Sequence, residues 1–337
     1  MTLAEIAHLA GVSRTTASYV INGKARERRI SQDTVDRVMA VVHQHDYRVD
    51  AQAAALRRGA SRILGLIIPD LENVSYARLA KRLERGAREA GYQLLIVGSD
   101  DCPESERELA LALRAQRCEV LITASSLPME DPFYADMMAA GLPVVAMDRG
   151  LDPRRFASVV SNDRMAAERL TRSLLDKSVR SIAWLDAVPA LSISQERRAG
   201  FLQALEGHHS VAVMTFGAER YGRAEGARLM CELLDQHGLP DALVTASYTL
   251  VDGVFDVLLE EGGLPPALRL ATFGDSRLLD FLPLPVNSAV QDHHRVAELT
   301  LACALAASRG DYRPGLQVVS RQHRWRLPKG KGAATTA

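Results

Sequence analysis

The chain has 337 residues, of which 47% are hydrophobic and 24% charged, which is ordinary for a globular protein and leaves room for two or three domains. No apolar run reaches the roughly 18 residues of a membrane helix, and the first residues lack the basic and apolar segments of a secretory signal. We therefore expect a cytoplasmic protein with no membrane partner.

Charge is distributed unevenly along the chain. The 41 basic and 41 acidic residues cancel overall, but residues 1–62 carry ten basic and six acidic side chains. A basic head on an acidic body fits a polyanionic partner for the head alone. The charge distribution alone is also consistent with an ordinary solvated surface on which the uneven distribution of charge arises by chance.

The four cysteines lie far apart and show no spacing typical of a metal or redox site. The sequence therefore predicts no metal and no cofactor. We expect reduced thiols that are mostly buried.

Three short helices are predicted in residues 1–46. Gly11 ends the first, Ser13 caps a second that runs to about Ile21, and Ser31 caps a third that runs to about His45. Two helices joined by a short glycine-containing turn indicate a helix-turn-helix, whose second helix enters the major groove of DNA. A small helical interaction domain is the alternative.

The second helix carries the candidate DNA-binding residues. Ser13, Arg14 and Thr15 occupy its first turn, where Arg14 is suited to paired bonds with a guanine edge. Tyr19 lies one turn on from Thr15, on the same face. Three further residues are placed for phosphate oxygens, which set register rather than sequence: Thr16, Ser18 and Asn22.

From residue 63 onward, strand-like apolar runs alternate with amphipathic helical stretches, which predicts parallel sheets covered by helices on both faces. The expected strands are 63–68, 94–97, 120–123, 144–147, 182–185, 211–216, 243–245 and 270–273. This is too much chain for one sheet, so we expect two α/β lobes. The expected boundaries are 1–46 for the head, 47–61 for a connecting segment, 62–328 for the two-lobed body and 329–337 for a disordered tail.

Polar side chains follow the predicted strands, where two such lobes form a ligand cleft. The candidates after strands are Asn73, Ser75, Ser125, Asp148, Arg149 and Asp275. Three further candidates lie elsewhere: Arg197 at the start of a predicted helix, and Gln291 and Arg321 on later crossing segments. The three arginines are suited to holding a phosphate by charge-assisted bonds. The alternative for each is an ordinary surface ion pair, including a local Asp148–Arg149 salt bridge.

The head resembles the start of the LacI/GalR repressor family. The resemblance is carried by Leu3-x-x-Ile6-Ala7-x-x-Ala10-Gly11-Val12-Ser13-x-x-Thr16-x-Ser18-x-Val20-x-Asn22. It implies a repressor of double-stranded operator DNA with a periplasmic-binding-protein-like body, a small-molecule effector and a homodimeric or tetrameric assembly. The sequence contains no C-terminal heptad run of the kind that would form a coiled-coil tetramer.

The same resemblance implies a hinge helix in residues 50–59. Leu56 matches the leucine that the family presses into the minor groove, where an apolar wedge kinks DNA. A plain linker is the alternative. The family usually has Pro-Asn where this chain has Val49-Asp50, so we expect weaker or more salt-sensitive docking of the hinge.

A narrower resemblance links the chain to the members of this family that respond to fructose. It is carried by residues 13–25, 69–73, 271–275 and 278–282. It implies a phosphorylated fructose as effector, namely fructose 1-phosphate with fructose 1,6-bisphosphate as a second candidate. It also implies control of fructose uptake and central carbon metabolism, and family resemblance supports sugar-binding roles for Asp148, Arg197 and Asp275.

Two other protein classes fit the sequence less well. A sugar-phosphate enzyme lacks support because there is no Walker loop, zinc-site spacing or nucleophile–base set, so no catalytic residues are predicted. A solute-binding protein of transport does not need a DNA-reading head. We therefore expect a regulator and not an enzyme.

Overall fold

The computed structural model describes residues 1–46 and 60–326. The expected hinge residue Leu56 and the expected tail at 329–337 therefore lie outside the described residues. Contacts divide the chain into two units, Met1–Ser61, called the head below, and Arg62–Ala337, called the body.

The head is a cluster of three helices, as predicted. They are α1 (Leu3–Leu9), α2 (Arg14–Ile21) and α3 (Gln32–Gln44). Gly11 adopts a φ of 65°, the left-handed conformation that glycine accepts at the turn between α1 and α2. The Thr16 amide donates to Ser13 Oγ at 3.0 Å, so Ser13 caps α2. The core that fixes the three helices is formed by Leu3, Ile6, Ala7, Ala10, Ala17, Val20 and Val38.

The first lobe of the body, called the N-lobe, is built on a six-stranded parallel sheet in the order β11-β5-β4-β3-β1-β2. Its strands are β1 (Ile63–Ile68), β2 (Gln93–Gly98), β3 (Val120–Thr123), β4 (Val144–Asp148), β5 (Ala157–Ser161) and β11 (Gly315–Val319). Its helices are α5 (Val74–Glu89), α6 (Pro103–Ala115), α7 (Phe133–Ala139) and α12 (His293–Ser308).

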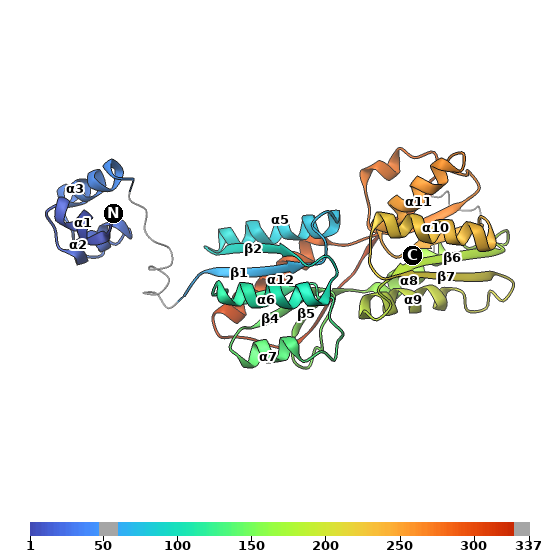
Figure 1. The fold of residues 1–337 in the computed structure, drawn as a ribbon, viewed down its shortest axis with the longest axis horizontal. Coiled ribbons are helices and arrows are strands. Elements are labelled where there is room, and N and C mark those ends of the chain that lie inside the picture. The colour runs from blue at the N-terminus through green and yellow to red at the C-terminus, as the bar shows by residue number, and fades with distance from the viewer. Residues whose placement is uncertain (47–59, 327–337) are drawn as a thin grey trace, which may run out of the picture. The chain divides into compact units, whose positions relative to one another are not determined.

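Alternation along the strands sends side chains to both faces of this sheet. Leu66 packs in the cluster that contains α5 and α12, whereas its neighbour Ile67 packs in the cluster that contains α6 and α7. The sheet is therefore covered on both sides (Figure 1), which explains why β1 reads as a continuous apolar run.

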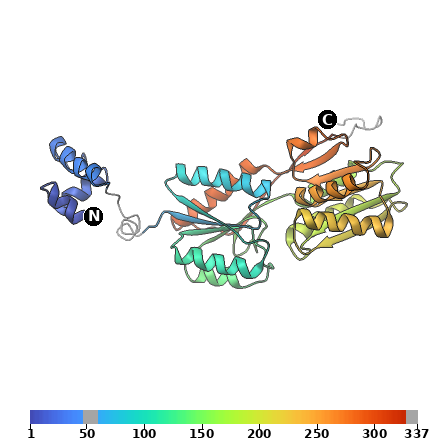
Figure 2. The same cartoon turned by 45° about the horizontal axis from the view of Figure 1, so that its top comes forward.

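The second lobe, called the C-lobe, repeats the plan with the strand order β12-β10-β9-β8-β6-β7. Figure 2 shows it as a second lobe of strands and helices beside the N-lobe. Its strands are β6 (Ser181–Ala187), β7 (Ala212–Ala218), β8 (Ala242–Thr245), β9 (Arg269–Phe273), β10 (Val286–Val290) and β12 (Gln322–Arg324), of which only β12 pairs antiparallel within the described residues. Its helices are α8 (Asp163–Arg172), α9 (Ser192–Ala204), α10 (Arg223–His237), α11 (Tyr248–Glu260) and the short 3₁₀ helix η1 (Arg277–Asp280).

The chain crosses between the lobes three times within the described residues. The crossings lie between β5 and α8, between β10 and α12, and between β11 and β12. They place Asn162, Gln291 and Arg321 at the junction of the two lobes. The predicted two-lobed parallel α/β body is confirmed.

Four strands were absent from the sequence prediction: β5, β10, β11 and β12. Two adjacent polar residues, Asn287 and Ser288, interrupt β10 (VNSAV), and β12 (QHR) is polar throughout, so neither strand has the continuous apolar run used to predict strands. Each of the four borders or leads into a crossing, where the sequence gives no signal that the chain is changing lobes.

The expectation of mostly buried thiols was wrong. All four cysteines are free, but only Cys118 is buried, Cys102 and Cys303 are half-buried, and Cys231 is exposed. Among the helices of the described residues, none combines the length and apolar character that a membrane span requires.

Candidate functional site

A pocket opens between the two lobes, next to the three crossings. Eight of the nine predicted effector residues line it: Asn73, Ser75, Asp148, Arg149, Arg197, Asp275, Gln291 and Arg321. The ninth, Ser125, follows β3 but is buried in the N-lobe and does not line the pocket, and its Oγ accepts the Leu127 amide at 3.0 Å. Five of these eight, Asn73, Ser75, Asp148, Arg149 and Asp275, were predicted by the rule that ligand-binding residues follow parallel strands.

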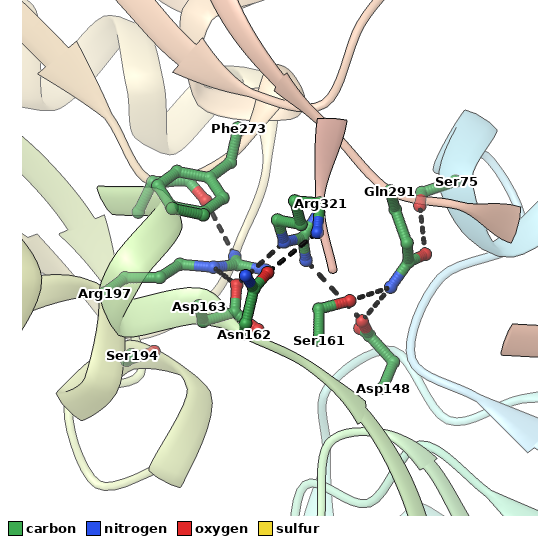
Figure 3. A network of polar contacts seen from close by, with 12 residues as sticks. Ser75, Asp148, Ser161, Asn162, Asp163, Ser194, Arg197, Phe273, Gln291 and Arg321 are labelled. Atoms are coloured by element: carbon green, nitrogen blue, oxygen red, sulfur yellow. Dashed lines mark hydrogen bonds and ion pairs between the residues drawn. The ribbon is translucent and has the colours of Figure 1, made fainter. Parts of the chain in front are cut away.

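Asp148 is held in a strained position at the end of β4. Its φ is 65°, a left-handed conformation that is uncommon outside glycine. Tyr76 of α5 donates to one carboxylate oxygen at 2.9 Å. The Gln291 side chain donates to the other at 2.5 Å (Figure 3). These bonds hold Asp148 in this conformation and orient its carboxylate at the pocket wall.

Arg149 pairs with a residue that the sequence analysis missed. Its Nη1 donates to Asp101 Oδ1 at 2.5 Å and to Ser126 Oγ at 3.1 Å, so its partner is not the adjacent Asp148. Burial lowers the pKa of Arg149, but Tyr76 and Asp101 outweigh burial and raise it above its usual range. Its guanidinium carbon lies 6.0 Å from the ring centre of Tyr221 in the C-lobe.

Arg197 and Arg321 share one carboxylate. Both donate to Asp163 Oδ1 through their Nε atoms (Figure 3). Burial lowers the pKa of Arg197, but Asp163, Tyr221 and Asp148 together outweigh burial and raise the pKa above its usual range. Burial and the charge of the nearby Arg197 lower the pKa of Arg321 more than the neighbouring carboxylates raise it, so the pKa of Arg321 is lowered. The positive charge of Arg321 is therefore the less well compensated of the two.

Asp275 is anchored by the C-terminal strand of the C-lobe. Its Oδ1 accepts Arg326 Nη2 at 2.8 Å and Ser288 Oγ at 2.7 Å, and its Oδ2 accepts Arg324 Nη1 at 3.2 Å. The same two arginines bond Asp280 of η1. A ligand hydroxyl that reached Asp275 would thus meet a carboxylate that is already oriented.

Ser75 and His293 join α5 to α12 at the N-lobe side of the pocket. Asn73 caps α5 by accepting the Ser75 amide at 3.0 Å. Ser75 Oγ lies 2.9 Å from His293 Nε2 and donates to Gln291 at 3.2 Å. Burial and the charge of Arg78 lower the pKa of His293 to about 4.

Several pocket residues were not predicted. They include Tyr76, Arg78, Asp101, Tyr221, Tyr248, Phe273 and His293. Asp101 follows β2 in the same way as the predicted residues follow their strands, so the same rule would have found it. Tyr221 and His293 carry no such signal, because a loop and a crossing bring them to the pocket.

The predicted DNA-binding residues of the head form two groups, one at the start of α2 and one near its end. Arg14 and Thr15 are exposed at the start of α2. Ser13 and Thr16 form the helix cap, and their hydroxyls lie 2.8 Å apart.

The second group of predicted residues, Ser18, Tyr19 and Asn22, lies near the end of α2. Asn22 Nδ2 donates to the Ser18 carbonyl at 2.7 Å, so this amide helps to end the helix. The guanidinium carbon of Arg28 lies 4.8 Å from the ring centre of Tyr19.

The pocket is suited to a polar ligand that carries an anionic group. It combines three buried guanidiniums with carboxylate, amide and hydroxyl groups and the apolar ring of Phe273. Forked guanidinium donors bind phosphate well, and oriented carboxylates bind sugar hydroxyls. The described residues contain no cluster of His, Cys, Asp and Glu suited to a metal ion.

Two family models match the chain. One, bacterial regulatory proteins of the lacI family, matches residues 2–50, and the other, periplasmic binding proteins and sugar binding domain of LacI family, matches residues 61–273. The chain belongs to the LacI family. The resemblance seen in the sequence is thereby confirmed, and the curated relatives of this LacI-family chain are named as regulators and not as enzymes.

The relatives extend over nearly the whole chain. The fructose operon regulatory protein of Vibrio cholerae is 50% identical over 322 residues, which are 96% of this chain and 98% of the relative. The catabolite repressor/activator of Escherichia coli strain K12 is 47% identical over 308 residues, which are 91% of this chain and 92% of the relative.

Solved structures agree with this assignment. The Cra transcriptional dual regulator from Pseudomonas putida, in complex with fructose 1-phosphate, is 51% identical with a TM-score of 0.76, and the match covers 79% of this chain and 99% of that one. The Lac repressor dimer bound to operator has a TM-score of 0.80 at 19% identity and covers 97% of this chain and 98% of that one, which shows the shared fold alone.

Proposed function

We propose that this LacI-family chain is a sequence-specific transcription regulator, mainly a repressor of genes for fructose and central carbon metabolism, which fructose 1-phosphate releases from operator DNA. The observation that carries the proposal is the pocket: three buried arginines from both lobes and a crossing line one space together with Asp148, Gln291 and Asp275. The solved relative at 51% identity contains fructose 1-phosphate, which supports this choice of ligand.

In the pocket, the anionic group of the effector binds the guanidinium donors of Arg197 and Arg321, and Arg149 contributes through the donors that Asp101 leaves free. Asp148, Asp275 and Gln291 bind sugar hydroxyls, and Asn73 and Ser75 complete the N-lobe wall. Ser125 is assigned no contact with the effector, because its hydroxyl is used within the N-lobe.

In the head, Arg14 reads a guanine edge, Ser13, Thr15 and Tyr19 accompany it in the major groove, and Thr16, Ser18 and Asn22 set the register on phosphates. The boundaries follow the sequence prediction, with a head at 1–46, a hinge and linker at 47–61 that carries Leu56, a body at 62–328 and a tail at 329–337. The regulator acts in the cytoplasm as a homodimer or tetramer.

Release follows from a two-state equilibrium. The effector binds the closed body more tightly than the open one, and closure separates the paired hinge segments through the dimer interface near residues 70–100. A ligand shifts such an equilibrium only by its differential affinity for the two states. A tenfold loss of operator affinity requires about 1.4 kcal/mol of coupling.

The test is an operator gel shift with the full chain, titrated separately with fructose 1-phosphate, fructose 1,6-bisphosphate and free fructose. We expect release by fructose 1-phosphate at the lowest concentration and no release by free fructose. Release by free fructose at equal concentration would exclude a pocket that selects an anionic group.

A further inference from the structure

Asp163 connects two arginines of the pocket without lining the pocket itself. It is the first residue of α8, directly after the crossing at Asn162, and only 5% of it is exposed. Its Oδ1 accepts Arg197 Nε at 2.7 Å and Arg321 Nε at 3.0 Å (Figure 3). One carboxylate oxygen thus orients two guanidiniums from separate parts of the chain.

Other contacts complete the orientation of both side chains. Arg197 Nη1 donates to the Ala246 carbonyl at 2.8 Å, and the Arg321 amide donates to Asn162 Oδ1 at 2.7 Å. The ring centre of Phe273 lies 4.4 Å from the guanidinium carbon of Arg197 and 5.3 Å from that of Arg321. The two guanidiniums therefore lie against one ring and one carboxylate.

This arrangement leaves donors for a ligand. Within residues 1–46 and 60–326, Arg197 Nη2 and Arg321 Nη1 have no hydrogen-bond partner, and Arg321 Nη2 lies 3.8 Å from Asp148. Both side chains line the pocket. Two like charges held this close repel each other, so the paired geometry depends on the carboxylate that both contact.

We propose that Asp163 is a positioning residue of the effector site, which holds Arg197 and Arg321 as one anion-binding pair without contacting the effector. The inference rests on the proposed function, because it assumes that the pair receives the anionic group of a sugar phosphate. The contribution of Asp163 is the placement of the two guanidiniums. Its own negative charge disfavours an anion, so loss of that charge alone would strengthen binding.

The difference between placement and charge gives opposite predictions for two substitutions. Asp163→Asn removes the charge. Asp163→Glu keeps the charge but moves the carboxylate by one methylene, so that one oxygen can no longer accept both Arg197 Nε and Arg321 Nε at short distance. Placement predicts that each variant binds fructose 1-phosphate at least tenfold more weakly. A charge effect alone predicts tighter binding by Asp163→Asn and unchanged binding by Asp163→Glu.

The experiment is calorimetric titration of fructose 1-phosphate into the full-length wild type, the two variants and a matched control, Asp256→Asn. Asp256 pairs with Arg223 through two bonds of 2.6 Å in the C-lobe, outside the pocket, so this control should bind like the wild type. Thermal melting and operator binding without effector are measured on each protein. We expect effector affinity to fall while operator affinity stays within twofold of the wild type.

A double-mutant cycle supplies a readout that a purely structural role would not give. If Asp163 acts through Arg321, Asp163→Asn should weaken binding much less in an Arg321→Ala background than in the wild type. Equal losses in both backgrounds would overturn the proposal, as would wild-type affinity in Asp163→Glu. If Asp163→Asn does not fold, Asp163→Glu carries the test. Failure of the wild type to bind fructose 1-phosphate would instead refute the proposed function.

Discussion

Ser75 Oγ lies 2.9 Å from His293 Nε2, which joins the first turn of α5 to the first turn of α12 across 218 residues of sequence. The histidine faces Arg78 and Arg82 of α5, Arg321 of the third crossing and Asp148 of β4. Burial and these arginines favour the neutral ring, so the contact with Ser75 is made by an uncharged imidazole at neutral pH.

This contact predicts a pH dependence of stability. The pKa of His293 is lowered to about 4, below the value of about 6.5 in an unfolded chain, so the unfolded state takes up the proton first as pH falls. The contribution of neutral His293 to stability is therefore complete above about pH 6.5 and decreases between about pH 6.5 and 4. Urea unfolding at pH 7.5 and 5.5 should show a smaller loss of stability for His293→Gln than for the wild type. An equal loss in both proteins would contradict the buried, neutral histidine.

Arg197→Ala should abolish most induction while operator binding persists. The substitution removes a buried cation and its donors to a ligand, for which a loss of about 1.5–3 kcal/mol, roughly tenfold or more in effector affinity, is expected. Calorimetry with fructose 1-phosphate measures the effect. Arg198→Ala is the matched control, because Arg198 is exposed on the same helix and does not line this pocket. Similar losses in both variants would argue against a specific role for Arg197.

Leu56→Ala should weaken operator binding and leave effector affinity nearly unchanged. The prediction comes from the sequence, since an apolar wedge at this position is expected to stabilise kinked DNA. Fluorescence anisotropy with a labelled operator duplex measures the first quantity and calorimetry the second. Unchanged operator affinity would favour a plain linker in residues 50–59.

Gly200→Ala should destabilise the C-lobe. A Cβ at Gly200 would lie 2.0 Å from the Arg164 carbonyl oxygen, so α8 and α9 would have to separate. Overpacking of this kind costs about 1–3 kcal/mol, occasionally more. Gly217→Ala is the control, because a Cβ there meets nothing within 4 Å. Thermal melting that lowers the midpoint equally in both variants would contradict the close approach of the two helices.

The sequence predicted the parts of the site that obey a local rule. Asp148 and Asp275 follow buried strands, and parallel strands end at the same edge of a sheet, so their place in the cleft could be predicted. The three helices of the head were likewise predicted from glycine and cap residues at fixed offsets, because the bonds that end a helix form within a few residues.

The pairing of side chains could not be predicted in the same way. Asp163 contacts Arg197 and Arg321, which lie 34 and 158 residues away, and Arg149 pairs with Asp101 although Asp148 is adjacent. Which side chains pair depends on the path of the chain through the three crossings. Those crossings lie beside strands that have no continuous apolar run, so the sequence did not predict their positions. The sequence therefore indicated the composition of the pocket better than its internal connections.

The measurement that tests the central claim most directly is the affinity for fructose 1-phosphate with and without saturating operator duplex. Linkage requires that DNA and effector change each other's affinity by the same factor. We predict that operator weakens effector binding by the factor by which effector weakens operator binding, with at least a tenfold change in each. Equal effector affinities in the presence and absence of operator would contradict the account.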